Sequence, residues 1–379
     1  MKIHKVAIVG GGLSGLYAAW LLERQDVDYV LLEARTRLGG RIISLPSATD
    51  GALTSEKRIT GQFDLGPTWF WPDMQPELIR LLDELELPVF AQFDTGDMMV
   101  ERSAHSTPER MRGFVSSPPS MRISGGMAAL TETLRAQLSP LKLMLGEPVK
   151  QIFLDGDRLA LETEQNAHRV DHILLALPPR LAVETIEFKP SLPEDLVQSW
   201  QQTATWMAPH AKYLAVFERP FWRDAGLSGS ARSSVGPMAE IHDASDESGN
   251  AALFGFIGVP ADIRVQLSTQ ELKLYCRNQL VRLFGEAAKT PKAEFLKDWA
   301  FDPFTATRAD QTGSSHPVGA PQSSSKSGPW QSRMTGIASE WSNEYPGYVA
   351  GAVDAAARGI ASCNYNGLSI ITKEQDHET

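Results

Sequence analysis

A glycine-rich turn close to the N-terminus constrains the fold of this chain more than any other feature. The apolar run Val6 to Val9 leads directly into Gly10-Gly11-Gly12-Leu13-Ser14-Gly15, and helical character continues to Arg24. A second apolar run, 29–32, ends on the acid Glu33. The order of strand, Gly-x-Gly-x-x-Gly, helix, strand and acid is that of a dinucleotide-binding unit.

Each residue of this unit has a separate physical task. Gly10 permits the tight turn, Gly12 lets a pyrophosphate approach the backbone, and Gly15 lets the helix pack closely on the strand. Free N–H groups at the start of the helix, around Leu13 and Ser14, face the phosphates. Glu33 is placed to accept both ribose hydroxyls and repels a 2′-phosphate, which disfavours NADP. NAD and FAD both remain compatible with this pattern.

The composition limits the classes of protein to consider. With 379 residues the chain can bury more than one core, so two domains are expected. The net charge of −10 argues against partners such as nucleic acid or an anionic membrane. Two cysteines cannot build a disulfide framework, and no apolar run reaches the roughly 18 residues of a membrane span. With no signal peptide apparent before the first strand and a polar tail, 373–379, we expect a cytoplasmic protein without a membrane anchor.

The residues after the second strand select between the two cofactors. The segment Glu33-Ala34-Arg35-Thr36-Arg37-Leu38-Gly39-Gly40-Arg41 resembles the FAD-binding start of the flavin amine oxidase superfamily. The resemblance implies FAD, with Arg41 contacting its phosphates or flavin end. Physically, Arg41 brings a planar, permanently charged donor fork to an anionic pyrophosphate. From this segment the predicted cofactor contacts are Glu33, Ala34, Arg35, Gly40 and Arg41.

Two further segments resemble cofactor contacts of the same family. Residues 61–72 resemble the family's Asp-x-Gly-Gly loop beside the flavin ring, with Pro67 in place of the second glycine. This resemblance implies contacts from Gly66, Pro67 and Thr68, and an aromatic wall against water from Trp69. Val149 follows Glu147-Pro148 in the segment whose backbone contacts adenine in the family. The interval 76–121 is shorter than the helical insertion of the amine oxidases, so we expect a reshaped or more open substrate mouth.

Lys212 is the predicted centre of the chemistry. It lies in a strand-like segment eight residues before Pro220-Phe221-Trp222-Arg223, a pattern that resembles the monoamine oxidases. The resemblance implies a lysine that holds a water against flavin N5, the atom that accepts hydride. A fixed positive charge there stabilises negative charge that develops on the flavin and on superoxide.

The last motif, residues 335–353, resembles the family's C-terminal flavin segment. It implies that Glu340 lies near the diphosphate or ribityl chain and that a helix begins at Gly347 and runs to about Ser362. The N–H groups of that helix would face the pyrimidine edge of the flavin, with Gly347, Tyr348 and Val349 in contact. Tyr348 is expected to form one side of an aromatic cage for the amine.

Two departures from the family bear on the cofactor and the cage. Residues 300–309 contain no cysteine, so we expect non-covalent FAD. Ungapped counting places Ala309 where monoamine oxidases carry the second cage aromatic, so either that wall is missing or Phe304 supplies it. Elsewhere, His242 and His316 lack partners at metal-ligand spacing, and no metal site is predicted.

Together these features predict an α/β protein with a Rossmann-like FAD-binding domain and a second, mixed-sheet substrate domain. The expected boundaries are 1–75, 122–200 and 316–379 for the first, and 76–121 and 201–315 for the second. The sequence pattern predicts helices over 77–85 and 269–284, a strand pair within 143–152, antiparallel strands over 158–163 and 170–175, and strands over 253–259 and 295–299. The resemblance of residues 122–130 to a family turn implies a further helix that runs to about Leu138.

The predicted function is oxidation of an amine C–N bond, with Lys212, Tyr348 and Trp69 as catalytic candidates. Hydride passes to flavin N5, the imine hydrolyses to a carbonyl compound and ammonia, and O2 reoxidises the flavin to give H2O2. A small-molecule amine and O2 are the expected partners. The alternatives are a related dehydrogenase or desaturase that acts on C–C bonds with another acceptor, and a non-catalytic FAD-binding protein. The identity of the amine and the oligomeric state are not readable from the sequence.

Overall fold

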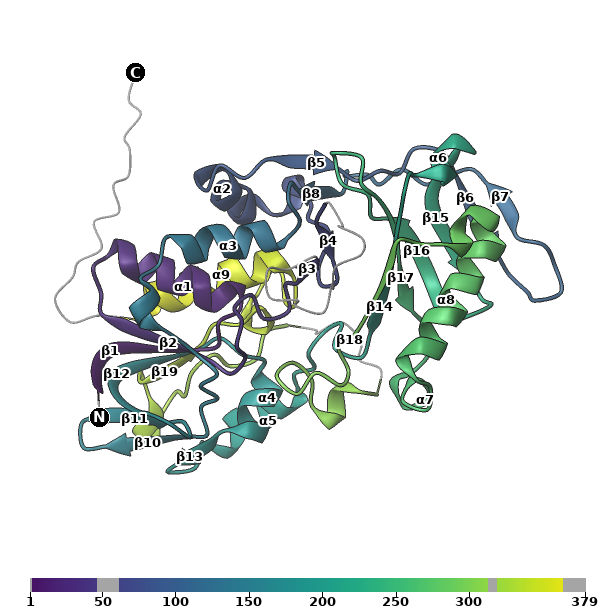
Figure 1. The fold of residues 1–379 in the computed structure, drawn as a ribbon. Coiled ribbons are helices and arrows are strands. Elements are labelled where there is room, and N and C mark those ends of the chain that lie inside the picture. The colour runs from purple at the N-terminus through teal and green to yellow at the C-terminus, as the bar shows by residue number, and fades with distance from the viewer. Residues whose placement is uncertain (1, 46–60, 313–318, 364–379) are drawn as a thin grey trace, which may run out of the picture.

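The computed structural model describes residues 2–45, 61–312 and 319–363, arranged around two large sheets (Figure 1). The first sheet has the strand order β13-β10-β11-β12-β1-β2-β9, and β19 also pairs with β12. Its centre is parallel, with β1 between β12 and β2. The strands of this sheet are β13 (Glu187–Lys189), β10 (Gln151–Asp155), β11 (Arg158–Glu162), β12 (Ala167–Leu175), β1 (Lys2–Val9), β2 (Tyr29–Glu33), β9 (Leu143–Leu145) and β19 (Met334–Gly336).

Helices cover both faces of this sheet, which explains why its central strands are continuously apolar. Side chains of β1 alternate between the faces: Val6 and Ile8 enter one core, and Ala7 and Val9 enter the other. The first core is closed by α1 (Leu13–Arg24), α2 (Pro76–Glu84), α3 (Ala128–Ala136) and α9 (Val349–Ser362). The second is closed by α4 (Pro179–Thr185) and α5 (Glu194–Gln202).

The second sheet has the order β18-β14-β17-β16-β15-β6-β7. Its strands are β18 (Ala293–Asp298), β14 (Ala211–Phe217), β17 (Ala251–Ile257), β16 (Met238–Asp243), β15 (Leu227–Ser233), β6 (Asp97–Glu101) and β7 (Glu109–Met111). The helix α8 (Thr269–Phe284) packs on one face, and the short helices α6 (Phe221–Asp224) and α7 (Ala261–Arg264) lie in connections. Two small pairs, β3 (Ser44–Leu45) with β4 (Phe63–Asp64) and β5 (Val89–Ala91) with β8 (Met121–Ile123), complete the described strands.

The alternation along β14 determines which way Lys212 points. All seven residues of this strand are buried. Tyr213, Ala215 and Phe217 pack toward α8, whereas Leu214 and Val216 pack against the hairpin of β3 and β4. By the two-residue period of a strand, Lys212 shares the face of Leu214 and therefore points toward the first sheet's loops.

Most of the elements expected from periodicity are confirmed. The helix over 269–284 has the expected bounds, and 158–163 and 170–175 lie in the antiparallel strands β11 and β12. The prediction of a strand pair within 143–152 is wrong, because β9 joins β2 and β10 joins β11. The interval after α2, which has no clear periodicity, forms β5 to β8, and β6 and β7 extend the second sheet. Residues 46–60, His316 and the tail 373–379 lie outside the described residues.

The packing of α1 on β1 yields a test of the fold. A Cβ placed on Gly15 would lie 2.0 Å from the carbonyl oxygen of Gly10, which is backbone and cannot yield. We expect Gly15→Ala to lower the free energy of unfolding by about 1–3 kcal/mol, measured by urea denaturation without added nucleotide. Gly12→Ala is the matched control, since its Cβ would meet only the Cα of Gly40, at 3.9 Å. Equal stability of the two variants would contradict the packing argument.

Candidate functional site

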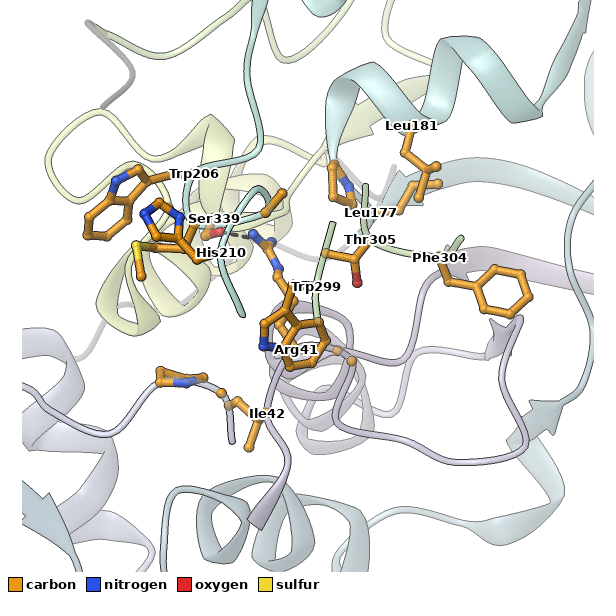
Figure 2. Close-up of a pocket in the computed structure, with 18 of the residues that line it drawn as sticks. Arg41, Ile42, Leu177, Leu181, Trp206, His210, Trp299, Phe304, Thr305 and Ser339 are labelled. Atoms are coloured by element: carbon orange, nitrogen blue, oxygen red, sulfur yellow. Dashed lines mark hydrogen bonds between the residues drawn. The ribbon is translucent and has the colours of Figure 1, made fainter. Parts of the chain in front are cut away.

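A cavity of about 960 Å³ lies between the two sheets and brings most of the predicted residues together. Figure 2 shows part of its lining, with Arg41 among the labelled residues. Its volume is at the upper end of the roughly 300–1,000 Å³ typical of ligand pockets. The predicted residues that line it are Gly10, Gly12, Leu13, Ser14, Glu33, Ala34, Arg35, Gly40, Arg41, Gly66, Pro67, Thr68, Trp69, Val149, Lys212, Gly347, Tyr348 and Val349. Gly15 and Glu340 are outside this lining: Gly15 packs on the turn, and Glu340 lies behind Arg41.

One end of the cavity is built from the glycine turn and Glu33. Gly10 has a φ of +112°, and a Cβ there would lie 2.6 Å from the carbonyl oxygen of Ala176. Gly12 leaves open space on the cavity side and precedes α1, whose first turn has no side-chain cap. The buried carboxylate of Glu33 accepts from the backbone N–H groups of Gly11 (2.6 Å) and Arg35 (2.8 Å). These bonds orient the carboxylate and leave further lone pairs for hydroxyl groups of a ligand.

Arg41 is held at the cavity wall by a buried partner. Its guanidinium donates to both carboxylate oxygens of Glu340, at 2.5 and 3.1 Å, and to the hydroxyl of Ser339 at 3.1 Å. Burial alone lowers the pKa of Arg41, but the adjacent carboxylate of Glu340 raises it overall. Glu340 thus fixes the direction of a permanent positive charge.

Lys212 is buried where the two sheets meet. Its Nζ donates to the hydroxyl of Thr68 at 2.6 Å and to the backbone carbonyl of Gly66 at 3.1 Å. The ammonium also lies 3.9 Å from the ring centroid of Phe254. Burial lowers the pKa of Lys212 to about 7, although the carboxylate of Asp64 acts in the opposite direction and Arg122 reinforces the decrease.

A second helix N-terminus opens on the same cavity. α9 begins at Val349, immediately after Gly347 and Tyr348, and it has no side-chain cap. Gly347 adopts a φ of +84°, and a Cβ there would approach Trp206 to 3.1 Å. The positive end of the α9 dipole therefore faces the cavity and favours negative charge there.

Aromatic rings surround the cavity beside α9. The ring centroid of Tyr348 lies 4.6 Å from that of Trp206 and 6.2 Å from that of Trp71. Phe304 instead lies over the guanidinium of Arg35, 5.3 Å from its ring centroid, at the Glu33 end. The suggestion that Phe304 supplies the second cage wall is therefore not supported by its contacts, and Trp206 and Trp71 adjoin Tyr348 instead.

Several cavity residues, among them an indole, an imidazole and a carboxylate side chain, were absent from the predicted set. Trp206, His210 and Glu240 line the cavity from the second sheet and the segment leading into it. Burial lowers the pKa of His210, and Arg264 lowers it further. The imidazole of His242, whose Nε2 lies 3.7 Å from the Glu240 carboxylate, lowers the pKa of Glu240 against the opposing effect of burial. Trp206 and His210 lie just before the strand of Lys212, and that proximity was the available signal for both.

This donor set fits an extended dinucleotide such as FAD. The fit rests on the open space at Gly12, which a side chain would fill, and on two uncapped helix N-termini facing one cavity. Glu33, Arg41 and the turn would hold the adenosine and pyrophosphate parts, and Gly66, Lys212 and Gly347 would surround the ring. Among the described residues, no helix has the length and apolar character of a membrane span, and no His, Cys, Asp and Glu cluster could hold a metal.

Comparisons with known proteins agree with this geometry. The family model described as flavin containing amine oxidoreductase matches residues 86–359, and that of an NAD(P)-binding Rossmann-like domain matches residues 8–85. The Probable flavin-containing monoamine oxidase A of Dictyostelium discoideum is 23% identical over 78% of this chain and 84% of its own length. Putrescine oxidase of Kocuria rosea is 23% identical over 79% of this chain and 83% of its own length.

Solved structures share the fold. A putrescine oxidase structure with bound putrescine superposes with a TM-score of 0.76 at 22% identity, covering 95% of this chain and 98% of that one. Cyclohexylamine oxidase from Brevibacterium oxydans IH-35A superposes with a TM-score of 0.75 at 19% identity, with the same coverage. The Rossmann-like unit and the mixed second sheet are therefore confirmed.

The burial of Lys212 predicts a pH-dependent stability. Between about pH 7 and the ordinary lysine pKa near 10.4, the unfolded chain binds a proton that the folded chain does not, so stability rises with pH there. Lys212→Met removes this dependence. Without added cofactor, the free energy of unfolding of Lys212→Met minus that of the parent should be higher at about pH 6.5 than at about pH 9, by roughly 2–3 kcal/mol. The variant is thus relatively more stable at the lower pH.

Lys273→Met is the control, because Lys273 lies outside the cavity lining and its Nζ donates to the backbone carbonyl of Glu294. The same difference between Lys212→Met and the parent at both pH values would contradict a buried, titrating ammonium.

Proposed function

Because this chain belongs to the flavin-containing amine oxidoreductase family, we propose that it is an oxidase of small amines that holds FAD without a covalent bond. The observation that carries the proposal is the meeting of the glycine turn, the ammonium of Lys212 and the N-terminus of α9 on one cavity. The family model spans both sheets, which supports amine oxidation over the dehydrogenase, desaturase and non-catalytic alternatives. We further propose that the boundaries 1–75, 122–200 and 316–379 enclose the FAD domain, and 76–121 and 201–315 the substrate domain.

When bound, FAD would supply a two-electron acceptor for hydride from the α-carbon of the amine, with O2 as the final acceptor of the electrons and H2O2 as its product. Within the cavity, Lys212 places a hydrogen-bonding Nζ between the hydroxyl of Thr68 and the carbonyl of Gly66, beside the proposed ring site. In its charged form Lys212 stabilises anionic charge on that side, and the dipole of α9 does so on the other. Positive groups from two sheets thus act on one acceptor.

The aromatic side chains orient the amine and exclude water. Tyr348 and Trp206, in contact at 4.6 Å between centroids, form one wall, and Trp71 extends it. Trp69 is fixed from behind by a hydrogen bond from its Nε1 to Gln92 Oε1 at 2.7 Å.

An uncharged amine is the reactive form, because only the neutral nitrogen has a lone pair to assist departure of the hydride. The rate should therefore rise with pH through the ionisation of the substrate.

Non-covalent binding is supported by the positions of the cysteines. Cys276 and Cys363 are both buried, and neither lines the cavity. Denaturation of the flavin-loaded protein should therefore release all flavin into the supernatant as intact FAD.

The function is tested by a panel of monoamines, diamines and amino acids, with H2O2 and reduction of an artificial dye as parallel readouts. We expect peroxide with at least one amine, and Lys212→Met to slow reoxidation by O2 by about 100-fold while FAD remains bound. Lys273→Met should behave as the parent. Dye reduction that is insensitive to Lys212→Met would favour the dehydrogenase, and a flavin-loaded protein inactive in both assays would favour the non-catalytic reading.

Glu240 gives a test of substrate class. Its carboxylate lines the second-sheet side of the cavity at about half exposure, and its lowered pKa keeps it charged at neutral pH. One relative is named putrescine oxidase, as is a structural neighbour with bound putrescine, and a diamine would present a distal ammonium to this carboxylate. Glu240→Gln should raise KM for putrescine by about three- to tenfold, consistent with a partly exposed ion pair, and leave KM for butylamine unchanged. Equal effects on both amines would exclude this contact.

A further inference from the structure

The segment 299–311, hereafter the strap, follows β18 in the second sheet but is fastened to parts of the first. It lines the cavity with Trp299, Pro303, Phe304, Thr305 and Gln311. Figure 2 shows Phe304 and Thr305 on the side of the cavity away from Trp206. The strap thus borders the part of the cavity that contains Glu33 and Arg35.

The first fastening is an ion pair between Asp302 and Arg35. The guanidinium of Arg35 donates to the Asp302 carboxylate and, at 3.0 Å, to the hydroxyl of Thr305. Both charged side chains are mostly buried, with exposed fractions of 13% for Arg35 and 8% for Asp302. Lys297 donates to the other carboxylate oxygen of Asp302 at 2.6 Å. Phe304 stacks on the same guanidinium.

The second fastening is made by Asp310. Its fully buried carboxylate pairs with Arg180 on α4 and accepts from the backbone N–H of Thr205 at 3.0 Å. The hydroxyl of Thr307 donates to the same carboxylate at 2.8 Å and closes a local turn. The strap is therefore tied to the first sheet's elements at two points, and the cavity-lining residues 303–305 lie between them in the chain.

The position of Arg35 indicates what lies beneath the strap. Arg35 follows Glu33 by two residues, and its backbone N–H donates to the Glu33 carboxylate. That carboxylate is the group placed to receive ribose hydroxyls in a dinucleotide-binding unit. Residues 302–305 of the strap therefore cover the adenosine side of the site.

We propose that the strap is the retaining element for the cofactor, and that the Asp302–Arg35 pair is the latch which must open before the adenosine part can leave. The inference depends on the proposed function only in that FAD occupies this cavity. Asp302 acts as a positioning residue through Arg35 and does not itself line the cavity. A latch of this kind compensates for the absence of a covalent flavin link within the strap, which contains no cysteine.

The electrostatics of the latch favour a strong effect on release. Burial by itself raises the pKa of Asp302, but Arg35 and Lys297 lower it overall, so the carboxylate is charged at neutral pH. Removing one partner of a buried charge pair leaves the other uncompensated, and such losses are expressed mainly in dissociation rates.

The test follows release of FAD from the flavin-loaded full-length protein by the rise in flavin fluorescence after dilution. Asp302→Asn is nearly isosteric and should speed dissociation by about tenfold or more, with a smaller change in the association rate. Asp302→Glu keeps the charge and should restore part of the retention. Thr305→Val removes the neutral acceptor of the same guanidinium and should accelerate release by a few-fold.

Glu101→Gln is the matched control. Glu101 is a buried carboxylate on β6 that pairs with Arg282 outside the cavity lining, so its loss should leave FAD release at the parental rate. Parental release rates in both Asp302→Asn and Thr305→Val would overturn the latch while leaving the proposed function intact. Equal acceleration by Glu101→Gln would also overturn it, since it would indicate general loosening. A parent protein that binds no FAD would instead refute the proposed function.

Discussion

The structure depends on a buried ammonium that joins its two sheets. Lys212 belongs to β14 of the second sheet, yet it donates to Gly66 and Thr68, which follow the β4 strand of the β3–β4 pair. Nearby, the indole N–H of Trp299 donates to the carbonyl of Leu65 at 3.1 Å. These bonds hold the two halves at a set distance across the cavity. Burial lowers the pKa of this amine to about 7, and pKa values perturbed in this way are enriched at functional sites.

The rest of the site is arranged about this charge by backbone geometry. Gly12 and Gly347 each precede an uncapped helix, and the two helix N-termini open on one cavity from distant parts of the chain. The N-terminus of α1 faces the region suited to phosphates, and the N-terminus of α9 faces the region near Lys212. Arg41, held by its buried partner Glu340, lines the same cavity. The cavity is lined by more cationic side chains (Arg35, Arg41, Lys150, Lys212 and Arg264) than carboxylates (Glu33, Glu147 and Glu240), although the net charge of the chain is −10.

The sequence predicts the parts of this arrangement that are encoded by short spacing. The glycine turn, Glu33, Lys212 and the helix after Gly347 all depend on local patterns, and the structure brings them to one cavity. The strands β5 to β7 could not be predicted, because their residues are short runs with little burial and therefore without clear alternation. The partners of β9 and β10 depend on tertiary pairing, which no local pattern specifies. Trp206 and the orientation of Phe304 likewise depend on contacts between distant segments, with Tyr348 and Arg35 respectively.

The central claim is that one flavin spans the cavity from Gly12 to Lys212. A crystal structure of the FAD-loaded protein tests it most directly. The account predicts one dinucleotide with its pyrophosphate at the start of α1, its ribose on Glu33, and its ring between Lys212 and the N-terminus of α9. A flavin bound elsewhere, or a ring turned away from Lys212, would contradict it.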